Sequence, residues 1–202
     1  MIRVLLAEDQ ALVRGALTAL LNLEPDIEVV DQVCDGAEAI TSLEANSDAY
    51  DLLVTDIEMP ETTGIELAEY IAKKKVDIKV AVVTTFGRAG YIRRAMAANV
   101  SCFLLKDAPS AQLAQALRFA MQGKKTIDPE LALAALDDRD PLTEKERKAL
   151  RLASEGMRTA NIADTLFLSE GTVRNYLSEA ISKLNATNRV DAARIAHQKG
   201  WL

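Results

Sequence analysis

Short apolar runs alternate with longer segments of helical apolar spacing along the first 122 residues. The short runs are typical of strands buried inside a sheet, and they lie at residues 2–7, 28–33, 52–55, 80–84 and 102–105. The segments with one apolar helical face lie at residues 11–22, 36–45, 64–74, 90–99 and 110–122. This alternation predicts an α/β fold with a doubly wound, five-stranded parallel sheet and helices on both of its faces.

The pattern changes later in the chain, and no strand is predicted beyond residue 142. Thr143 and Glu146 have the spacing of a capping box, in which both side chains satisfy free backbone N–H groups at a helix start. Helices are predicted at residues 144–155, 158–166, 169–184 and 188–199. The tight connection between the second and third helices is typical of a small all-α helix-turn-helix domain.

These patterns divide the chain into three parts. Residues 1–122 form the first domain, residues 123–140 a linker with a short helix at 130–136, and residues 141–202 the second domain. The linker is assigned from its polar run at residues 137–141, which has no apolar face. The net charge of −6 is uneven, because the last part holds ten basic and seven acidic residues whereas the remainder holds 14 and 23. The mild basic excess suggests nucleic acid as a partner of the second domain.

The composition excludes several classes of protein. No apolar run approaches the ~20 residues of a membrane span, and no secretory leader precedes the first strand, so we expect a cytoplasmic protein without membrane insertion. Cys34 and Cys102 lack metal-site spacing, and both are expected to be small buried residues in a reducing compartment. There is no Gly-rich phosphate loop with Lys and no Ser/His/Asp set. The single histidine, His197, is expected to serve in packing or an interface.

Polar residues suited to phosphoryl chemistry follow or end four of the predicted strands. Glu8 and Asp9 follow the first strand and Asp56 the third, whereas Thr84 ends the fourth and Lys106 follows the fifth. Ligands of open α/β sheets bind at the carboxyl ends of strands, so these side chains are expected at one edge. Three carboxylates repel one another unless a cation lies between them, and hard oxygen ligands suit Mg²⁺. An Asp beside such an ion can attack phosphorus, so the group predicts a phosphoryl site.

These five residues resemble the signature of bacterial two-component receiver domains, which have a flavodoxin-like fold. The resemblance covers residues 1–122 and implies that Asp56 accepts a phosphoryl group from a sensor histidine kinase. It also implies a Mg²⁺ site made by Glu8, Asp9, Asp56 and the backbone carbonyl of Glu58. Lys106 would pair with the phosphate, and Thr84 would move to bond it. Phe103 occupies the family's aromatic switch position, although plain packing in a buried strand also accounts for it.

Two features depart from the common receiver pattern. Glu8 replaces the more usual Asp, which lengthens this ligand and keeps its charge. Glu58 stands two residues after Asp56, and Phe86 two residues after Thr84, where both flank the path of an attacking water. We hypothesise that Glu58 and Phe86 set the lifetime of the phosphate. An unchanged dephosphorylation rate in a Glu58→Asn variant would contradict this.

The predicted helix at residues 169–184 has a polar face. Side chains there that can reach phosphates or base edges are Thr172, Arg174, Asn175, Ser178 and Lys183. An ordinary amphipathic helix with a solvated face would show the same pattern. The surrounding sequence, however, closely resembles the LuxR-type helix-turn-helix of NarL/FixJ response regulators, through the runs LTEKE, ANIA, LSEGTVRNY and ISKL.

This second resemblance covers residues 140–202 and implies that the helix enters the major groove of double-stranded DNA. It also implies a homodimer formed through the last helix, whose seam would lie near Val190, Ala193, Arg194 and His197. Ser178 stands where many relatives carry a basic residue. A monomer would therefore make fewer phosphate contacts and bind DNA less tightly.

The whole chain resembles more closely the DesR-like branch of Gram-positive regulators, through the runs EDQ, DIEMP and TTF with GY. That branch works with a membrane sensor kinase. The expected function is a transcription factor that dimerises and binds its promoter when Asp56 is phosphorylated. Enzymatic activity is expected only as uptake and loss of its own phosphate.

Two alternatives remain open. The first is a Mg²⁺-dependent phosphatase with an aspartyl nucleophile, although such enzymes generally have Asp-x-Asp where this chain has Asp56-Ile57-Glu58. Turnover of small phosphate esters would favour it. The second is a constitutive DNA-binding protein whose receiver is never phosphorylated. DNA affinity that is unaffected by a phosphodonor or by Asp56→Ala would favour that reading.

Overall fold

The computed structural model of the chain describes residues 1–85, 87–127 and 140–202. It divides into two compact units, one that begins at Met1 and one that ends at Leu202, and each is described by itself. The short helix predicted at residues 130–136 lies outside the described residues, as does Phe86.

The first unit contains a parallel sheet with the strand order β2-β1-β3-β4-β5-β6. Its strands are β1 Ile2–Ala7, β2 Ile27–Val33, β3 Leu52–Thr55, β4 Lys79–Thr84, β5 Cys102–Leu105 and β6 Thr126–Ile127. The five predicted strands are confirmed, with β2 and β4 each one residue longer. The predicted strand number is one too low, because β6 adds to the edge of the sheet beside β5. β6 is only two residues long and follows two lysines, so it contains no apolar run from which a strand could be predicted.

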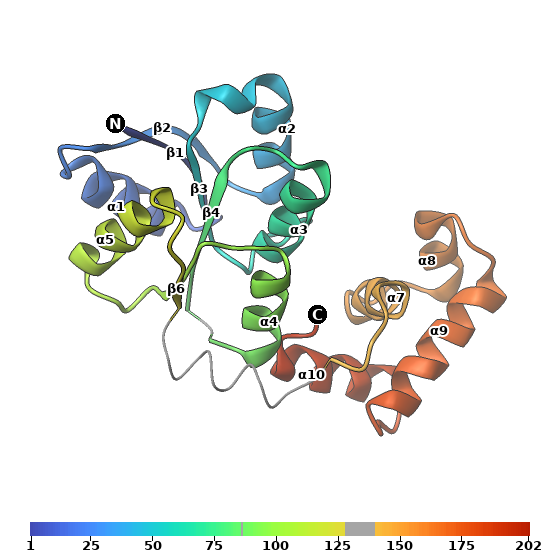
Figure 1. Cartoon of the computed structure of the whole chain (residues 1–202). Helices are drawn as coiled ribbons and strands as arrows, with labels where there is room; N and C mark the ends of the chain where they lie inside the picture. Colours follow the sequence, from blue (N-terminus) through green and yellow to red (C-terminus); the bar gives the residue numbers. More distant parts are fainter. Residues whose placement is uncertain (86, 128–139) are drawn as a thin grey trace. The chain divides into compact units, whose positions relative to one another are not determined.

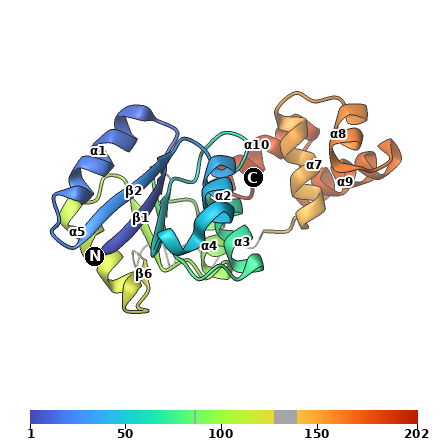
Figure 2. The same cartoon turned by 90° about the horizontal axis from the view of Figure 1, so that it is seen from above.

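Helices cover both faces of this sheet, as the alternation predicts. They are α1 Ala11–Asn22, α2 Gly36–Asn46, α3 Gly64–Lys74, α4 Ala89–Ala97 and α5 Ser110–Met121, with a short 3₁₀ turn at Ser47–Ala49. Figures 1 and 2 show α1 and α5 on one face, and α2, α3 and α4 on the other. This layering leaves the carboxyl ends of the strands as the open edge at which a ligand can bind.

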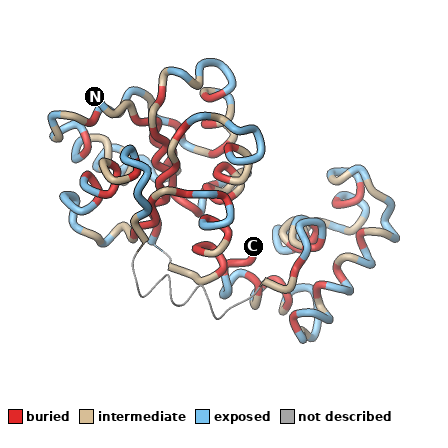
Figure 3. Tube along the Cα trace, in the orientation of Figure 1, coloured by how far each residue is buried: buried red, intermediate tan, exposed pale blue. Residues whose placement is uncertain are grey.

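The core of the first unit lies on the two faces of the sheet. On the face of α1 and α5, Leu6 and Val54 of the strands pack in one cluster with Leu21 and Leu117 of the helices. Figure 3 shows the strands as the most continuously buried part of the unit. Burying each such side chain contributes about 1.5–3 kcal/mol. The strand ends that carry the polar residues are therefore held by a rigid scaffold.

The second unit is entirely helical in the part that the structure describes. Its helices are α7 Glu144–Ser154, α8 Thr159–Leu166, α9 Glu170–Lys183 and α10 Arg189–Lys199. The predicted capping box is confirmed, because Thr143 and Glu146 each bond the other's backbone N–H. Leu150, Ile162, Val173 and Ala196, one from each helix, belong to a single core cluster.

The connection between α8 and α9 is the turn of the predicted helix-turn-helix. Phe167 ends α8 in the left-handed region, with φ 55°. Ser169 then caps the start of α9, because its side chain accepts a hydrogen bond from the backbone N–H of Thr172 at 3.2 Å. Val173 and Leu177 are buried along this helix, so the helix is amphipathic.

One expectation about the cysteines is wrong. Cys102 is fully buried in β5, as expected, but Cys34 is exposed in the connection between β2 and α2. The prediction rested on cysteine being among the most buried residue types on average, and this average does not hold for Cys34, which lies in a loop. None of the helices in the described ranges is long and apolar enough to cross a membrane.

Candidate functional site

The end of β3 places Asp56 at the centre of the candidate site. The backbone N–H of Asp56 donates to the carbonyl of Ala7 at 3.0 Å, which fixes it beside the end of β1. Its Oδ1 accepts a hydrogen bond from the backbone N–H of Ile57 at 2.6 Å. The residue is only 4% exposed. A buried carboxylate at a strand end requires compensation by partners, because burying a charge is costly.

A glycine lets the helix after this strand approach Asp56 closely. Gly64 opens α3, and a Cβ atom added there would lie 1.8 Å from the carbonyl oxygen of Asp56. The backbone N–H of Gly64 donates to the carbonyl of Ile57 at 3.0 Å. Close approach of two backbone segments is a reason for glycine, independent of its conformational freedom. Gly64 therefore helps to hold the segment that contains Asp56 and Glu58.

Lys106 bridges two of the carboxylates. Its Nζ lies 2.8 Å from Asp56 Oδ2 and 2.7 Å from Glu8 Oε2, and its side chain is 10% exposed. Burial by itself lowers the pKa of Lys106, but the hydrogen bonds to Asp56 and Glu8 outweigh it and raise the pKa above its ordinary value. The ammonium is therefore charged at neutral pH. The structure thus brings together Glu8, Asp56 and Lys106 at the ends of the first, third and fifth strands, which were expected to meet at one edge.

A third carboxylate, that of Asp9, lies close to the two that pair with Lys106. One oxygen atom from each of Glu8, Asp9 and Asp56 lies within 4.8 Å of the others, in an arrangement that could hold a metal ion. Asp9 Oδ1 is buried and has no hydrogen-bond partner in the described part of the chain. Burial raises the pKa of Glu8, and Lys106 only partly offsets this. The excess negative charge, the orphan oxygen and the all-oxygen donor set fit a hard divalent cation.

The structure places the remaining predicted residues of the first unit as follows. Thr84 is fully buried at the end of β4, where its carbonyl accepts a hydrogen bond from the backbone N–H of Lys106 at 2.8 Å. Phe103 is fully buried in β5, and its role as a switch stays a prediction. Glu58 is exposed in the loop after Asp56. Phe86 lies outside the described residues, so the predicted pair with Glu58 is not described.

Two residues near the site were missed from the sequence. Arg14 Nη1, from α1, donates to the backbone carbonyls of Glu8 at 2.5 Å and of Asp9 at 3.3 Å. Tyr91, from α4, donates through its hydroxyl to Glu58 at 3.4 Å. Arg14 falls one helical turn after the start of α1, but this spacing alone does not show that it bonds backbone carbonyls. Arg14 holds the backbone of the loop that carries two carboxylates.

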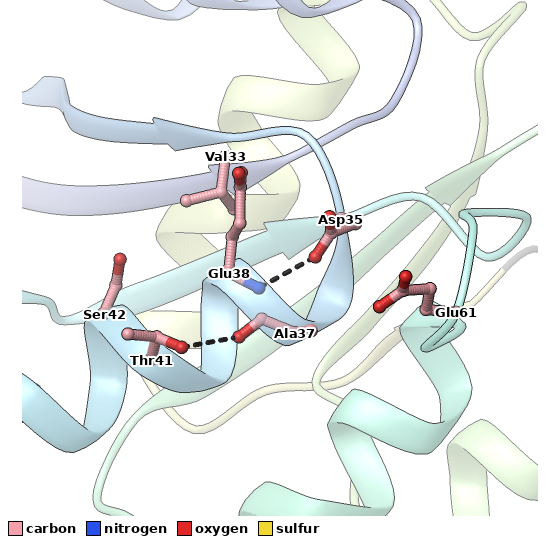
Figure 4. A pocket seen from close by; sticks show the side chains of 7 residues that line it. All are labelled: Val33, Asp35, Ala37, Glu38, Thr41, Ser42 and Glu61. Carbon is pink, nitrogen blue, oxygen red and sulfur yellow. Dashed lines mark hydrogen bonds between the residues drawn. The ribbon is translucent and has the colours of Figure 1, made fainter.

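A second acidic group lies beside the first turn of α2. Asp35 and Glu38 face a hollow of about 510 Å³, with Glu61 on its other side (Figure 4). The Cys34 thiol donates to Glu38 Oε2 at 3.1 Å, and this bond raises the pKa of the thiol. Hydrogen bonds join Cys34, Asp35 and Glu38 to one another, and no lysine is among the residues that line the hollow.

Helix α9 presents most of the predicted DNA-binding residues at its surface. Arg174, Asn175 and Ser178 are exposed, and Thr172 is half-buried with its hydroxyl 2.9 Å from Ser169 Oγ. Arg174 lies within ion-pair distance of Glu170 one turn earlier, at 4.0 Å. Such an exposed pair contributes little and leaves the guanidinium available to another anion.

Lys183 is exposed, as expected, but its ammonium has a partner that the sequence did not predict. Its Nζ lies 2.8 Å from both carboxylate oxygens of Glu146 in α7. The sequence pattern showed only that Lys183 ends an amphipathic helix, and Glu146 is 37 residues earlier in the chain.

The predicted dimer residues on α10 are not all at the surface. Val190 is 72% exposed, and Arg194 and His197 are exposed too. Ala193 is only 4% exposed and belongs to the core of the second unit. Val190, Arg194 and His197 are therefore at the surface, whereas Ala193 packs within the unit.

Comparisons with known proteins agree with this division of chemistry between the two units. The family described as "Response regulator receiver domain" matches residues 4–118, and the family described as "Bacterial regulatory proteins, luxR family" matches residues 140–196. The uncharacterized transcriptional regulatory protein YvfU of Bacillus subtilis strain 168 is 46% identical over the whole of both chains. The transcriptional regulatory protein DesR of the same organism is 42% identical over the whole of this chain and 99% of its own.

A solved structure extends this likeness. The crystal structure of the response regulator ChrA of a heme-sensing two-component system is 34% identical, covering 100% of this chain and 98% of that one, with a TM-score of 0.57. The predicted resemblances to receiver domains, to LuxR-type helix-turn-helix domains and to DesR are confirmed.

Proposed function

Because the chain belongs to the two-component response regulators with a LuxR-type DNA-binding domain, we propose that Asp56 is its phosphoacceptor and that phosphorylation controls its binding to promoter DNA. The observation that carries this proposal is the buried Asp56 carboxylate, bonded to Lys106 at 2.8 Å within a group of three carboxylates. The family consists of DNA-binding regulators rather than enzymes that turn over a substrate.

A phosphoryl group would reach Asp56 from a sensor histidine kinase or from a small acyl phosphate. A carboxylate oxygen of Asp56 attacks phosphorus, the bond from phosphorus to the donor nitrogen or oxygen breaks, and imidazole or carboxylate leaves. Lys106 is already charged and 2.8 Å from Asp56, so it can pair with the arriving phosphoryl oxygens.

Glu8, Asp9, Asp56 and the backbone carbonyl of Glu58 would hold Mg²⁺ in this proposal. The ion, when bound, supplies charge neutralisation for the phosphoryl oxygens. Arg14 would keep the Glu8–Asp9 backbone in place through its bonds to both carbonyls. Glu58, exposed beside this group, would then influence how fast water removes the phosphate.

The response would pass from the fourth and fifth strand ends to the rest of the chain. Thr84 and Lys106 are joined by a backbone hydrogen bond of 2.8 Å, so a backbone shift at Thr84 that accompanies movement of its hydroxyl toward a phosphate would reach the end of β5 as well. Phe103 lies fully buried in that strand and would have to repack. A shift between two packing states needs only a few kcal/mol of differential interaction, about what new charge-assisted bonds supply.

The output would be a homodimer that presents two copies of α9 to successive turns of the major groove. Arg174, Asn175 and Ser178 are exposed on that helix, and Val190, Arg194 and His197 are exposed on α10. Ala193 is not part of this proposed interface, since it packs in the core.

One experiment tests the sequence of events in order. The full chain is incubated with acetyl phosphate with and without Mg²⁺, and intact mass, oligomeric state and binding to its own promoter region are followed. We expect a Mg²⁺-dependent gain of one phosphoryl group, a shift to dimer and tighter DNA binding. Full labelling with unchanged association and DNA affinity would favour a constitutive DNA-binding protein instead.

A further inference from the structure

The recognition helix α9 is joined to the start of α7 by one ion pair. Lys183 is the last residue of α9, and its Nζ lies 2.8 Å from both Oε1 and Oε2 of Glu146. Glu146 is 5% exposed, whereas the Lys183 side chain is 32% exposed. An ion pair with one buried partner is more costly to break than an exposed pair, because it would leave a buried charge alone.

Glu146 is itself fixed by the backbone of α7. Its Oε2 accepts a hydrogen bond from the backbone N–H of Thr143 at 2.8 Å, while its own backbone N–H donates to Thr143 Oγ1 at 3.3 Å. Burial alone would raise the pKa of Glu146, but the bonds from Lys183 and Thr143 outweigh it and lower the pKa. Glu146 is thus a charged, immobile anchor to which the end of α9 is attached.

The two ends of α9 are held in different ways. The N-terminal end is held by the Ser169 cap and by buried Val173. The C-terminal end is held by buried Leu184 and by the Lys183–Glu146 pair. The exposed residues that would meet DNA, Arg174 and Asn175 among them, lie between these two supports. A change at one support would tilt the helix and displace its exposed side chains together.

We propose that Lys183 is a positioning residue for DNA binding: its ion pair with Glu146 holds α9 at the angle at which Arg174 and Asn175 meet base edges, and its ammonium does not itself neutralise a DNA phosphate. The proposal rests on the proposed docking of α9 in the major groove. It assigns to Glu146, a buried residue of another helix, a share in DNA recognition.

Salt dependence separates positioning from direct phosphate contact. A lysine that neutralises a phosphate releases a counterion, so its removal lowers the slope of log affinity against log salt by about 0.9. A positioning lysine leaves that slope unchanged. It lowers instead the preference for the specific sequence over an unrelated one, because misplaced side chains lose base contacts rather than charge.

Glu146→Gln is the most informative variant. Glutamine keeps the size of the side chain and an oxygen that accepts from the Thr143 N–H, so the cap of α7 is retained. The change also frees Lys183. Positioning predicts weaker specific binding in this variant, whereas a direct phosphate contact predicts equal or tighter binding, because the ammonium no longer has a competing carboxylate.

The measurement uses the full chain and two duplexes of equal length, one selected from random sequences by the unmodified chain and one scrambled. For Glu146→Gln and Lys183→Met we expect about a fivefold or greater loss on the selected duplex, a much smaller loss on the scrambled one, and an unchanged salt slope. Lys183→Arg should restore the affinity, since a guanidinium can retain the pair. Near-ultraviolet circular dichroism identifies variants that have lost native packing, and Glu146→Gln decides the question if Lys183→Met is among them.

Two comparison variants make the result interpretable. Lys148→Met removes one positive charge from α7 at an exposed pair with Glu144, whose oxygen lies 3.1 Å away, and should leave specific binding unchanged. Arg174→Met tests the docking itself and should weaken binding to the selected duplex. If Arg174→Met has no effect, the proposed docking is wrong. If Arg174→Met weakens binding but Glu146→Gln does not, or if Lys183→Met lowers the salt slope by about 0.9, the positioning role is wrong.

Discussion

The edge of the receiver sheet and the first turn of α7 each bury a glutamate beside a lysine, with opposite consequences for the glutamate. Glu8 shares Lys106 with Asp56 and lies near Asp9, and its pKa is raised, first by burial. Glu146 has Lys183 to itself and the Thr143 N–H in addition, and its pKa is lowered although burial opposes this. The difference is the number of acids for each cation. The Glu146–Lys183 pair is balanced in charge and serves as a structural connection. The group of Glu8, Asp9 and Asp56 has more negative than positive charge, and such an unbalanced group is suited to bind a cation.

Removal of the acid proposed to accept the phosphate should abolish labelling of the receiver. Asp56→Asn keeps the size of the side chain but removes the nucleophilic oxygen, so we expect no gain of mass with acetyl phosphate and Mg²⁺. Asp51→Asn is the matched control. Asp51 precedes the opposite end of β3 and is bound to Arg3 at 2.8 Å, and this variant should be labelled like the unmodified chain. Labelling of Asp56→Asn to the same extent as the unmodified chain would show that another residue accepts the phosphate.

Disturbing the close packing around Asp56 should destabilise the fold and slow phosphorylation. Gly64→Ala would place a Cβ atom 1.8 Å from the Asp56 carbonyl oxygen, so the loop must shift. We expect a loss of roughly 1–3 kcal/mol in the free energy of unfolding, measured by urea denaturation, together with slower phosphorylation. Gly15→Ala, where a Cβ atom meets nothing within 4 Å, should cause no loss. If Gly64→Ala left the free energy of unfolding unchanged, the site would be less rigid than its contacts indicate.

Cation binding at Glu8, Asp9 and Asp56 should stabilise the folded receiver, whereas the Glu146–Lys183 pair should bind no cation. Saturating Mg²⁺ is expected to stabilise the receiver by about 1–3 kcal/mol, seen as a higher Tm in calorimetry, because the ion binds the folded state only. Asp9→Asn, which alters the residue with the orphan oxygen, should remove most of this increase. Glu38→Gln, in the second acidic group beside α2, should keep it. An increase lost in Glu38→Gln alone would move the cation site to that hollow.

The contribution of the Glu146–Lys183 pair to the free energy of unfolding should depend on pH. The pKa of Glu146 in the folded chain lies below its ordinary value of 4.5, so its contribution is fully present above pH 4.5 and is lost as the pH falls through the lowered value. Glu146→Gln should therefore be less stable than the unmodified chain at pH 7, by roughly 1 kcal/mol. The gap should close on acidification, which thermal denaturation at several pH values can follow. A gap that is constant with pH would mean that the charge of Glu146 contributes nothing.

The smallest expected effect concerns the open surface of α9. A Cβ atom at Gly171 would meet only Ser169 Oγ, at 3.8 Å, in contrast to the crowded Gly64. Gly171→Ala should raise the free energy of unfolding by roughly 0.5 kcal/mol, because alanine has the higher helix propensity. Urea denaturation of the full chain measures this. A loss of stability instead would indicate that the first turn of α9 is not the regular helix described.

The sequence predicted the parts of the fold that local patterns determine. β1 and α1 match their predicted bounds, because a continuous apolar run and a regular helical face leave little freedom. The five strand-end residues were expected at one edge, since parallel strands must end together. The strands that carry Glu8, Asp56 and Lys106 are brought together as expected, and their carboxylate and ammonium groups are in contact.

What the sequence could not show depends on contacts between distant segments. The helical period was enough to predict that Lys183 is exposed, whereas its partner Glu146 depends on how α7 packs on α9. Arg14 was missed because its acceptors are backbone carbonyls, which have no signature in a sequence. Strand β6 was missed because two residues cannot show a period, and only the edge of β5 gives them a partner.

That short strand matters for anyone who wishes to study the receiver in isolation. β6 covers one edge of the sheet, where Thr126 and Ile127 pair with Cys102 and Phe103. A fragment that stops at residue 122 would leave the main-chain groups of an apolar strand open to solvent, and such an edge invites other chains to add to it. A truncated receiver that ends beyond Ile127 should therefore remain monodisperse at concentrations where the shorter one forms aggregates.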